Sequence, residues 1–360
     1  MKVQLQKMLG IRYPIIQAPM AGFDSPELVA AASNAGALGS LGAQYRTPDE
    51  IKKAIGEIRS LTDKPFAVNL FALKDHATPS DDRIIKARDY LQKYYAQFGI
   101  AAPSTEAVKT QIDPEAQLET ILEASVPIFS FTLGILAPKW ISAFKKRSTI
   151  LIGTATNVKE ARLLEKAGVD AIAAQSTEAG GHRGTFIGPY ENSLIGGLAL
   201  IPQLADAVHV PIIAAGGIMD GRGIAAALAL GAEAVQLGTA FLTVAECKIH
   251  SNYKRAIQEH DADDTVITNV FSGGEARGIE NKFITENTAS PLLAFPYHNA
   301  LTRPIRRAAS ETGQIDYINL WSGQAGRLAR MATVKELVEY LMSDTEAVLA
   351  KLNRLQKATR

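Results

Sequence analysis

Short apolar runs alternate with longer amphipathic segments along most of this chain, and this alternation is what most limits its possible folds. The runs are rich in Val, Ile and Ala and are bounded by Gly or Pro, which is typical of buried parallel strands. There are eight such runs, and each is followed by a helix or by a segment able to hold one. The predicted strands are 14–19, 38–41, 66–70, 126–131, 150–153, 169–173, 211–215 and 234–237.

Eight βα units within about 240 residues predict an α/β protein with a (β/α)8 TIM barrel. A doubly wound open sheet is the structural alternative. The barrel is favoured by the number of strands and because the unusual residues follow strand ends, where barrel enzymes place their active sites. The clearest predicted helices are 26–35, 48–60, 138–145, 158–167, 194–207 and 221–230, with Thr47 as an N-cap before Pro48.

Two parts of the chain depart from this rhythm. Residues 75–112 are charged and helix-forming, with no clear strand, and residues 247–310 contain mixed helical segments. Both are predicted to form a smaller, mainly helical cap domain, built from insertions, over the barrel mouth. The barrel itself is assigned to residues 1–74 and 113–246. An amphipathic pattern at 334–357 predicts that the segment of about 311–360 returns to the barrel.

Charge and hydropathy exclude several classes of partner. With 38 Lys+Arg and 37 Asp+Glu, the net charge is +1, which gives no electrostatic case for nucleic acid or an anionic membrane. No run approaches the ~18 apolar residues of a membrane helix. The N-terminus lacks the apolar region of a secretory signal, and the one cysteine, Cys247, permits no internal disulfide. A soluble, cytoplasmic protein is expected.

The loop after the sixth predicted strand, A-Q-S-T-E-A-G-G-H-R-G (174–184), is the most suggestive of chemistry. Its glycines allow a close approach of the backbone to a ligand. His182 is a side chain that can take up or release a proton near neutral pH. The alternative is a glycine-rich turn with a solvated His. Its position on a barrel strand end favours a His182 that faces the ligand cavity beside Gln175.

Other strand ends carry further candidates. Met20, in Q-A-P-M-A-G (17–22), suits the face of a flat aromatic ligand, although gap-filling in the core is the alternative. Asn69 ends an apolar run and as a core residue would need every hydrogen bond satisfied internally, so ligand contact is at least as plausible.

The last two strand ends resemble a phosphate site. They read A-A-G-G-I-M-D-G-R (214–222) and Q-L-G-T-A-F (236–241). Adjacent Gly-rich turns at the seventh and eighth strands form the usual phosphate site of such barrels. Gly216 and Gly217 allow close approach, while Gly238 and Thr239 offer donors. Tight βα turns are the alternative for either motif alone, but the two together favour a phosphorylated ligand.

No metal site is expected. The five histidines other than His182 show no metal-ligand spacing with a cysteine or carboxylate. The sequence also lacks a G-x-S-x-G elbow, a P-loop and an H-E-x-x-H motif.

Taken together, I-Q-A-P-M-A-G, E-A-G-G-H-R-G-T-F, A-A-G-G-I-M-D-G-R-G and V-Q-L-G-T-A-F-L resemble the nitronate monooxygenase family of FMN-dependent enzymes. The similarity covers nearly the whole chain. Two later segments, P-Y-H-N-A-L-T-R-P-I-R (296–306) and L-W-S-G-Q-A-G-R-L-A-R (320–330), resemble the tail of the class I members. The chain reads S-G-Q-A at 322–325, where the family usually reads A-G-Q-G.

The resemblance implies a role for individual residues. His182 matches the active-site histidine, Met20 matches the residue against the isoalloxazine, and Tyr297 and Arg303 lie in the segment near the substrate. The positions that match the family's other FMN contacts are Asn69, Gln175, Gly180, Gly217, Gln236, Leu237, Gly238 and Thr239.

The reaction implied is oxidation of an alkyl nitronate by O₂ to a carbonyl compound and nitrite, with one-electron transfer to FMN. Propionate 3-nitronate, a toxic metabolite, is the substrate expected from the family, which implies a role in detoxification. An FMN-dependent NADH:quinone reductase or enoyl-carrier-protein reductase on the same scaffold is the alternative, and a binding protein without activity is a third. Whether the chain is a monomer or a homodimer is left open.

Overall fold

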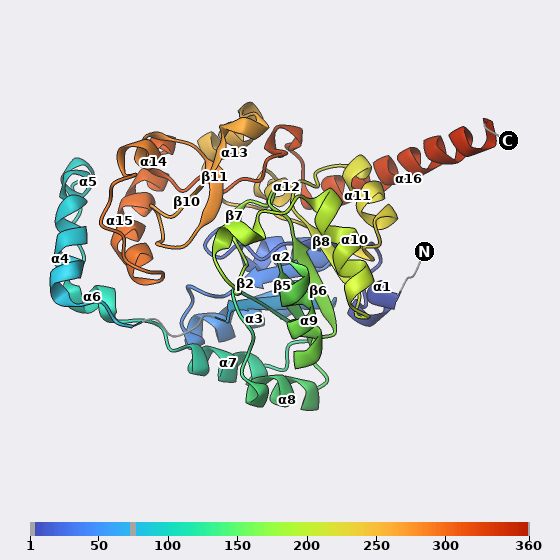
Figure 1. The fold of residues 1–360 in the computed structure, drawn as a ribbon, viewed down its shortest axis with the longest axis horizontal. Coiled ribbons are helices and arrows are strands. Elements are labelled where there is room, and N and C mark those ends of the chain that lie inside the picture. Colours follow the sequence, from blue (N-terminus) through green and yellow to red (C-terminus); the bar gives the residue numbers. More distant parts are fainter. Residues whose placement is uncertain (1–3, 73–76, 359–360) are drawn as a thin grey trace.

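In the computed structural model, which describes residues 4–72 and 77–358, eight parallel strands form one sheet (Figure 1). Their order is β1-β9-β8-β6-β5-β4-β3-β2. The strands are β1 (Ile15–Gln17), β2 (Gly39–Gly42), β3 (Phe66–Phe71), β4 (Ile128–Thr132), β5 (Ile150–Ala155), β6 (Ala171–Gln175), β8 (Ile212–Ala215) and β9 (Ala234–Leu237).

The sheet closes on itself where its first and last strands meet. The backbone N–H of Gln17 donates to the C=O of Leu38, and the N–H of Leu38 donates to the C=O of Ile15, both at 2.9 Å. Ile16 and Leu38 therefore form a parallel bridge between β1 and the residue before β2. The predicted TIM-barrel fold is confirmed, and the alternative of an open sheet is wrong.

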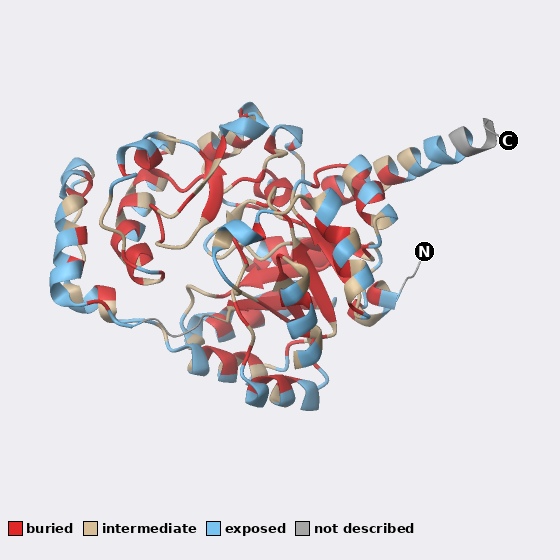
Figure 2. Cartoon of the chain, viewed as in Figure 1, coloured by how far each residue is buried: buried red, intermediate tan, exposed pale blue. Residues whose placement is uncertain are grey.

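Helices surround the barrel strands, with buried faces inward and exposed faces outward (Figure 2). Those beside the barrel are α1 (Gln4–Leu9), α2 (Pro26–Asn34), α3 (Pro48–Leu61), α7 (Pro114–Glu123), α8 (Pro138–Lys146), α9 (Val158–Ala167), α10 (Gly197–Ala207), α11 (Gly221–Ala229), α12 (Thr239–Leu242) and α16 (Val334–Ala358). α16 packs against α11 and α2.

Local sequence signals explain where these helices begin and end. Thr47 caps α3 in a capping box with Glu50, and Pro48 occupies the first helical position, as predicted. The side chain of Asn157 caps the start of α9. That helix ends at Gly168, whose φ of 97° is the left-handed conformation that favours glycine.

One apolar cluster fills the interior of the barrel on the side of α1. It joins inward residues of the strands, such as Ile16, Ile128 and Ile213, to Leu5 and Leu9 of α1. α1 therefore closes the N-terminal end of the barrel with buried leucines. A ligand-binding site is therefore expected at the opposite end of the barrel, where the carboxyl ends of the strands meet.

A second sheet was not predicted from the sequence. In the described part of the chain it has three antiparallel strands, in the order β10 (Thr265–Thr268), β11 (Ala276–Ile279) and β7 (Gly181–His182). His182 pairs with Ala276 in this sheet. The loop after β6 is thus fastened as a strand to the segment that follows the barrel. A strand of two residues is too short to show a period of two.

Among the described residues, the remaining α-helices are α4 (Asp81–Tyr90), α5 (Gln92–Gln97), α6 (Thr105–Lys109), α13 (Ser251–Glu259), α14 (Lys282–Glu286) and α15 (Tyr297–Glu311). α4–α6 lie beside α14 and α15 (Figure 1). The Tyr94 hydroxyl donates to Glu286 at 2.7 Å, and the Tyr95 hydroxyl donates to the C=O of Leu301 at 2.9 Å. The proposed barrel–cap boundary at 74/75 falls within 73–76, outside the described residues, and the division into barrel and cap remains a prediction.

The described helices include none with the length and hydropathy needed to span a bilayer.

Candidate active site

A cavity of about 580 Å³ lies at the carboxyl end of the barrel. Its walls come from the ends of β1, β3, β4, β5, β6, β8 and β9 and, on the opposite side, from α15 and the segment 318–325. The size is that of a ligand pocket. The sequence-predicted residues that line it are Met20, Asn69, Gln175, Gly180, His182, Gly217, Gln236, Leu237, Gly238, Thr239 and Arg303. The fold therefore brings together candidates that lie up to 283 positions apart in the sequence, from Met20 to Arg303.

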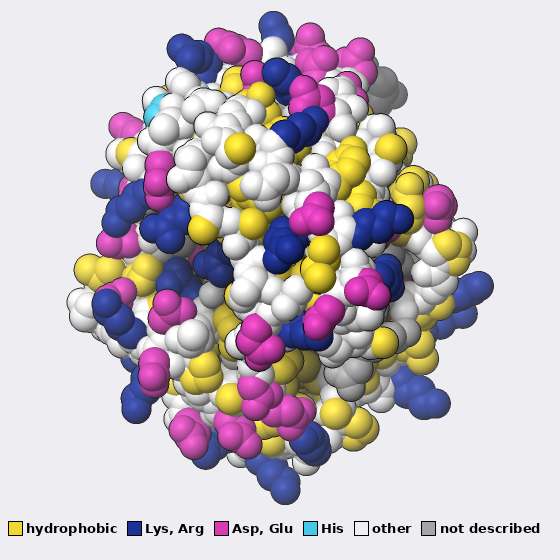
Figure 3. Space-filling model, turned by 90° about the vertical axis from the view of Figure 1, so that its left-hand side faces the viewer, with side chains coloured by type: hydrophobic (Ala, Val, Ile, Leu, Met, Phe, Trp, Pro, Cys, Tyr) yellow, Lys and Arg dark blue, Asp and Glu magenta, His cyan; other side chains and the backbone are white. Residues whose placement is uncertain are grey.

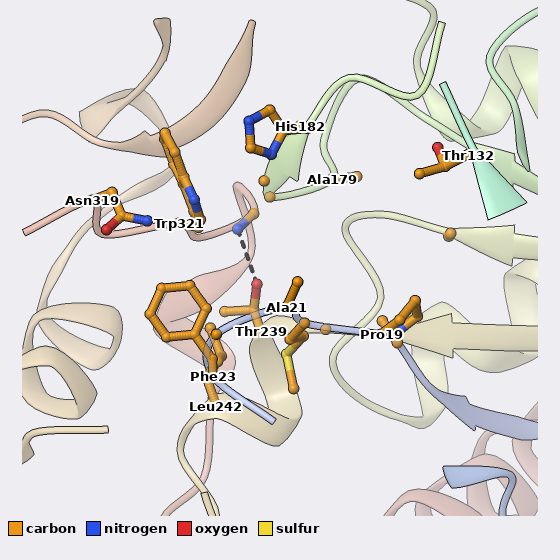
Figure 4. Close-up of a pocket in the computed structure, with 18 of the residues that line it drawn as sticks. Pro19, Ala21, Phe23, Thr132, Ala179, His182, Thr239, Leu242, Asn319 and Trp321 are labelled. Atoms are coloured by element: carbon orange, nitrogen blue, oxygen red, sulfur yellow. Dashed lines mark hydrogen bonds between the residues drawn. The ribbon is translucent and has the colours of Figure 1, made fainter. Parts of the chain in front are cut away.

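His182 lies among aromatic rings at the cavity wall. The ring centroids of Phe71, Phe295 and Trp321 are 5.8, 5.5 and 5.7 Å from that of His182. Figure 4 shows His182 and Trp321 on the same side of the pocket. Burial, and to a smaller extent the positive charge of Arg306, lowers the pKa of His182 to about 4. The imidazole is therefore neutral at pH 7, in a state that accepts a proton rather than one that attracts an anion.

The side chains of Gln175, which is half-buried, and of the buried Arg183 hold the backbone around His182. The Gln175 amide donates to the C=O of His182 at 2.9 Å and accepts from the N–H of Gly184 at 2.7 Å. Arg183, only 2% exposed, donates to the C=O groups of Gln175, Ser176 and Ser193. Gln175, for which a cofactor contact was predicted, positions the histidine loop in this structure.

A buried carboxylate fixes the next part of this loop. Glu160, on α9, is fully buried and accepts at Oε1 from the Thr185 hydroxyl and from the N–H groups of Phe186 and Ile187. Its Oε2 accepts from the N–H and hydroxyl of Thr156. A buried charge with five donors is well satisfied. His182 therefore lies on a stretch of chain that is tied to the barrel at both ends.

Glycines form the wall at the last two barrel strands. Gly216 and Gly217 have φ of 111° and 70°, which other residues rarely adopt. At Gly180 a Cβ would lie 2.6 Å from the N of Gly323, so this glycine is needed for the loop to pack on 322–323. The Thr239 hydroxyl accepts from the N–H of Gly323 at 3.0 Å, the bond drawn in Figure 4. Backbone rather than side chain therefore faces much of this end of the cavity.

Three arginines of α15, Arg303, Arg306 and Arg307, line the cavity on the side opposite the barrel, and Arg307 pairs with Glu311 at 3.0 Å. Arg303 and Arg306 are three residues apart and so share one face of the helix. The Arg306 guanidinium donates to the C=O and side-chain oxygen of Asn299, while its Nε is buried without a partner. Burial lowers the pKa of Arg306 to about 10, and the positive Arg303 also lowers it. Among the described residues, neither Arg303 nor Arg306 has a carboxylate within 4 Å. Within the part of the chain that the structure describes, these two positive charges therefore lack a counter-ion.

Tyr297, the other residue expected near a substrate, lies elsewhere. It is buried, its hydroxyl is 3.4 Å from that of Thr78, and it is not among the described residues that line the cavity. We therefore assign it no substrate contact. The tyrosine that the structure places in the wall is Tyr45, whose ring centre is 5.9 Å from the Arg303 guanidinium.

A buried aspartate, Asp24, positions the turn that carries Met20. Its Oδ2 accepts from the N–H groups of Met20 and Gly42, at 2.8 and 2.7 Å, and so ties this turn to the end of β2. Its Oδ1 is buried without a partner. Burial raises the pKa of Asp24 to about 7, against the opposing effects of the two backbone bonds and of Arg46.

Replacing Asp24 by Asn is expected to stabilise the protein at pH 8. The folded-state pKa of Asp24 is raised from 3.8 to about 7, so the folded state binds more protons than the unfolded state between these values. This carboxyl therefore reduces stability as the pH rises through that window. Asn keeps an acceptor without the charge, and the gain in unfolding free energy should reach a few kcal/mol, at ~1.4 kcal/mol per pKa unit.

The measurement is the melting temperature of both proteins from pH 5 to pH 8. The difference between them is expected to grow with pH. A constant difference would mean that Asp24 does not titrate in this range.

Sequence reasoning missed several residues of the site. Tyr45, Phe71, Ser272, Arg306 and Trp321 all line the cavity. Of these residues, Phe71 could have been predicted from a local pattern, because it follows Asn69 by two positions in β3 and so lies on the same face of the strand. The others come from segments whose approach to the barrel no local pattern reveals. The described residues contain no group of three or more His, Cys, Asp or Glu side chains placed to hold a metal ion.

The sequence of this chain is similar to those of known proteins over nearly its whole length. A family model described as nitronate monooxygenase matches residues 2–344. A probable nitronate monooxygenase of Staphylococcus saprophyticus is 42% identical over 351 residues, covering 95% of this chain and 97% of the relative. The corresponding protein of Staphylococcus aureus strain Newman is 41% identical, with 97% and 98% covered.

Two solved structures are similar over almost the whole fold. The nitroalkane oxidase of Streptomyces ansochromogenes has a TM-score of 0.89 and 36% identity, with 97% of this chain and 99% of that chain covered. FabK of Thermotoga maritima has a TM-score of 0.78 and 30% identity, with 99% of both chains covered.

Proposed function

The chain belongs to the nitronate monooxygenase family, an oxidoreductase family, and from this premise we propose that it is an FMN-dependent enzyme that oxidises alkyl nitronates with O₂. The products are a carbonyl compound and nitrite, and propionate 3-nitronate is the proposed substrate. The observation that carries the proposal is that one cavity wall holds a neutral His182 together with Arg303 and Arg306, which have no carboxylate within 4 Å among the described residues.

The residues present fit a phosphorylated flat cofactor. Gly217 and Gly238 line the cavity without side chains, so that backbone N–H groups can approach a phosphate. Met20 lines the cavity on a turn fixed by Asp24 and suits the face of a ring system. When bound, FMN supplies the electron acceptor for the nitronate, which is chemistry that no side chain of the cavity provides.

The side chains of the cavity then bind and orient the anionic substrate. Arg306 and Arg303 supply the positive potential that an anion requires. Because His182 is neutral, it does not add to that potential. It acts on the neutral nitroalkane instead, where it removes the α-proton and so produces the nitronate within the site. The rings of Phe71 and Trp321 beside the imidazole exclude water from this step.

Attraction of the anionic substrate is a property of the cavity rather than of the surface beside it. Figure 3 shows Lys, Arg, Asp and Glu side chains interspersed over the face that carries α4 and α5. Mixed charges of this kind give no broad field that would steer an anion. Arg303 and Arg306, which have no carboxylate partner in the described part of the chain, are therefore the proposed source of anion affinity.

A reductase that takes electrons from NADH is the second candidate, because FabK of Thermotoga maritima shares the fold at 30% identity. Anaerobic absorbance of the purified protein discriminates between the two. We expect the flavin to lose its oxidised spectrum on mixing with propionate 3-nitronate and to keep it on mixing with NADH. Rapid bleaching by NADH alone would replace the monooxygenase assignment by a reductase.

A further inference from the structure

Ser272 is the hydrogen-bond partner of the His182 ring. Its hydroxyl oxygen is 2.8 Å from Nε2 of His182. Ser272 is 1% exposed and lies in the turn between β10 and β11, while His182 lies on β7 in the same sheet. The contact therefore joins two segments that are 90 residues apart. Such a contact determines which of the two ring nitrogens carries the proton.

The proton of the Ser272 hydroxyl has another acceptor. The hydroxyl donates to the C=O of Gly274 at 3.1 Å, and it accepts from the N–H of Gly274 at 3.3 Å. A carbonyl oxygen can only accept, so the bond to the C=O of Gly274 uses the single hydroxyl proton of Ser272. One lone pair then remains on Ser272 Oγ, and it requires a donor. Nε2–H of His182 is the donor within reach.

From this accounting we propose that Ser272 holds His182 as the Nε2–H tautomer, which leaves Nδ1 as the basic nitrogen of the active site. In the opposite tautomer, Ser272 would donate to Nε2 and the C=O of Gly274 would lose this donor. Nδ1–H would also need an acceptor, and among the described residues no hydrogen bond joins a protein group to Nδ1. The proposed tautomer satisfies all three groups and leaves Nδ1 as an acceptor on a residue that lines the cavity.

The inference rests on the proposed function for its chemical consequence. With a neutral nitroalkane as substrate, the Nδ1 lone pair takes the proton on the carbon next to the nitro group. The electron pair of that C–H bond moves into the nitro group, and the nitronate anion forms with a positive imidazolium beside it. Ser272 does not touch the substrate in this scheme. It is a positioning residue that acts through His182.

The backbone anchors described above make this assignment specific. The Gln175 amide binds the C=O of His182 and the N–H of Gly184, and His182 pairs with Ala276 in the second sheet, so the backbone that carries the imidazole is held beside Ser272. The nearby rings of Phe71, Phe295 and Trp321 offer no acceptor that could compete for the ring proton.

The test is the tautomer itself, read from ¹H–¹⁵N correlation spectra of the holoenzyme with ¹⁵N-labelled histidine at pH 7. The signal of His182 is identified by its loss in His182→Asn. We expect a protonated Nε2 and an unprotonated Nδ1. A protonated Nδ1, or an averaged mixture of both forms, would overturn the proposal whatever the enzyme's activity.

Two variants test the role of Ser272. In Ser272→Ala the tautomer preference should weaken, and turnover of a neutral nitroalkane should fall by about tenfold, the worth of one to two lost hydrogen bonds. Turnover of preformed nitronate should change less. Ser272→Thr, which keeps the hydroxyl, should restore both the tautomer and the turnover. Full nitroalkane turnover in Ser272→Ala would show that Ser272 does not position the base.

These readouts separate the two proposals. If the wild-type spectrum shows the Nε2–H tautomer but no nitronate is oxidised, the proposed function fails while the tautomer assignment stands. If nitronates are oxidised and the spectrum shows Nδ1–H, the function stands and the tautomer assignment fails.

Discussion

Replacing His182 by Asn is expected to reduce the turnover of a neutral nitroalkane by about 10²- to 10⁴-fold, the usual contribution of a positioned general base. Turnover of the preformed nitronate should change little, because the proton has already left and a neutral imidazole contributes no charge to binding the anion. The measurement is kcat/KM for the same compound supplied in its two protonation states.

The pH dependence follows from the environment of His182. Burial and the positive charge of Arg306 lower its pKa to about 4, so the basic form is present throughout the neutral range. The ionisation of His182 should therefore reduce nitroalkane turnover only as the pH drops toward about 4. An ordinary solvated histidine would already cause a loss near its unperturbed pKa of about 6.5.

His209→Asn is a matched control, because the side chain of His209 is fully exposed on the surface. It should leave both activities unchanged. Equal losses of nitroalkane and nitronate turnover in His182→Asn would contradict a role as base and would point to a general contribution of the imidazole to the shape of the site.

The second large effect is expected for Arg306→Met. In the proposed complex, Arg306 forms a charge pair with the bound nitronate anion. Removing one partner of a buried, hydrogen-bonded charge pair costs about 2–5 kcal/mol, so kcat/KM for an anionic nitronate should fall by about 100-fold or more. The reason is that Arg306 is half-buried at the cavity wall, with its Nε buried and without a hydrogen-bond partner among the described residues. A bound anion would complete its hydrogen bonds and its charge balance.

The same variant should not destabilise the protein. A buried cation without a counter-ion carries a desolvation cost, and an unbranched apolar side chain of similar length removes that cost. The melting temperature of Arg306→Met should therefore equal or exceed that of the wild type. Greater stability together with weaker substrate binding is the pattern expected where a site is arranged for function.

Arg327→Met is the matched control for this experiment. Arg327 is not among the described residues that line the cavity, and its guanidinium is exposed and pairs with Asp261 at 3.2 Å. An exposed ion pair of this kind contributes little, so both kcat/KM and stability should stay close to those of the wild type. If Arg306→Met and Arg327→Met behave alike, the anion is bound elsewhere.

The positions of the strands and helices of the barrel could be predicted from the sequence. β9 and α9 begin and end at the predicted residues, and Thr47 caps α3 as its spacing to Glu50 requires. These features depend on neighbours within a few positions, because apolar periodicity and caps are local properties. The site residues at strand ends were predictable for the same reason, since a parallel barrel brings all its carboxyl ends to one face.

Other parts of the site depend on contacts between distant segments. Arg306 reads in the sequence as one of several basic residues on a helix, and Ser272 as part of a glycine-rich turn. Only the packing of α15 and of the β10–β11 turn over the barrel brings them to the cavity. The same packing leaves Tyr297 outside the cavity wall and places Tyr45 in it.

The sequence by itself determined the barrel, its strand-end glycines and the presence of a histidine among them, because each follows from local pattern and from the geometry of parallel strands. Only the tertiary structure decided the chemical state of that histidine. Its neutral form results from burial among Phe71, Phe295 and Trp321 and from the nearby charge of Arg306, and its proposed tautomer depends on Ser272. A pKa and a tautomer depend on what surrounds a side chain in space, and these neighbours come from four separate segments of the chain.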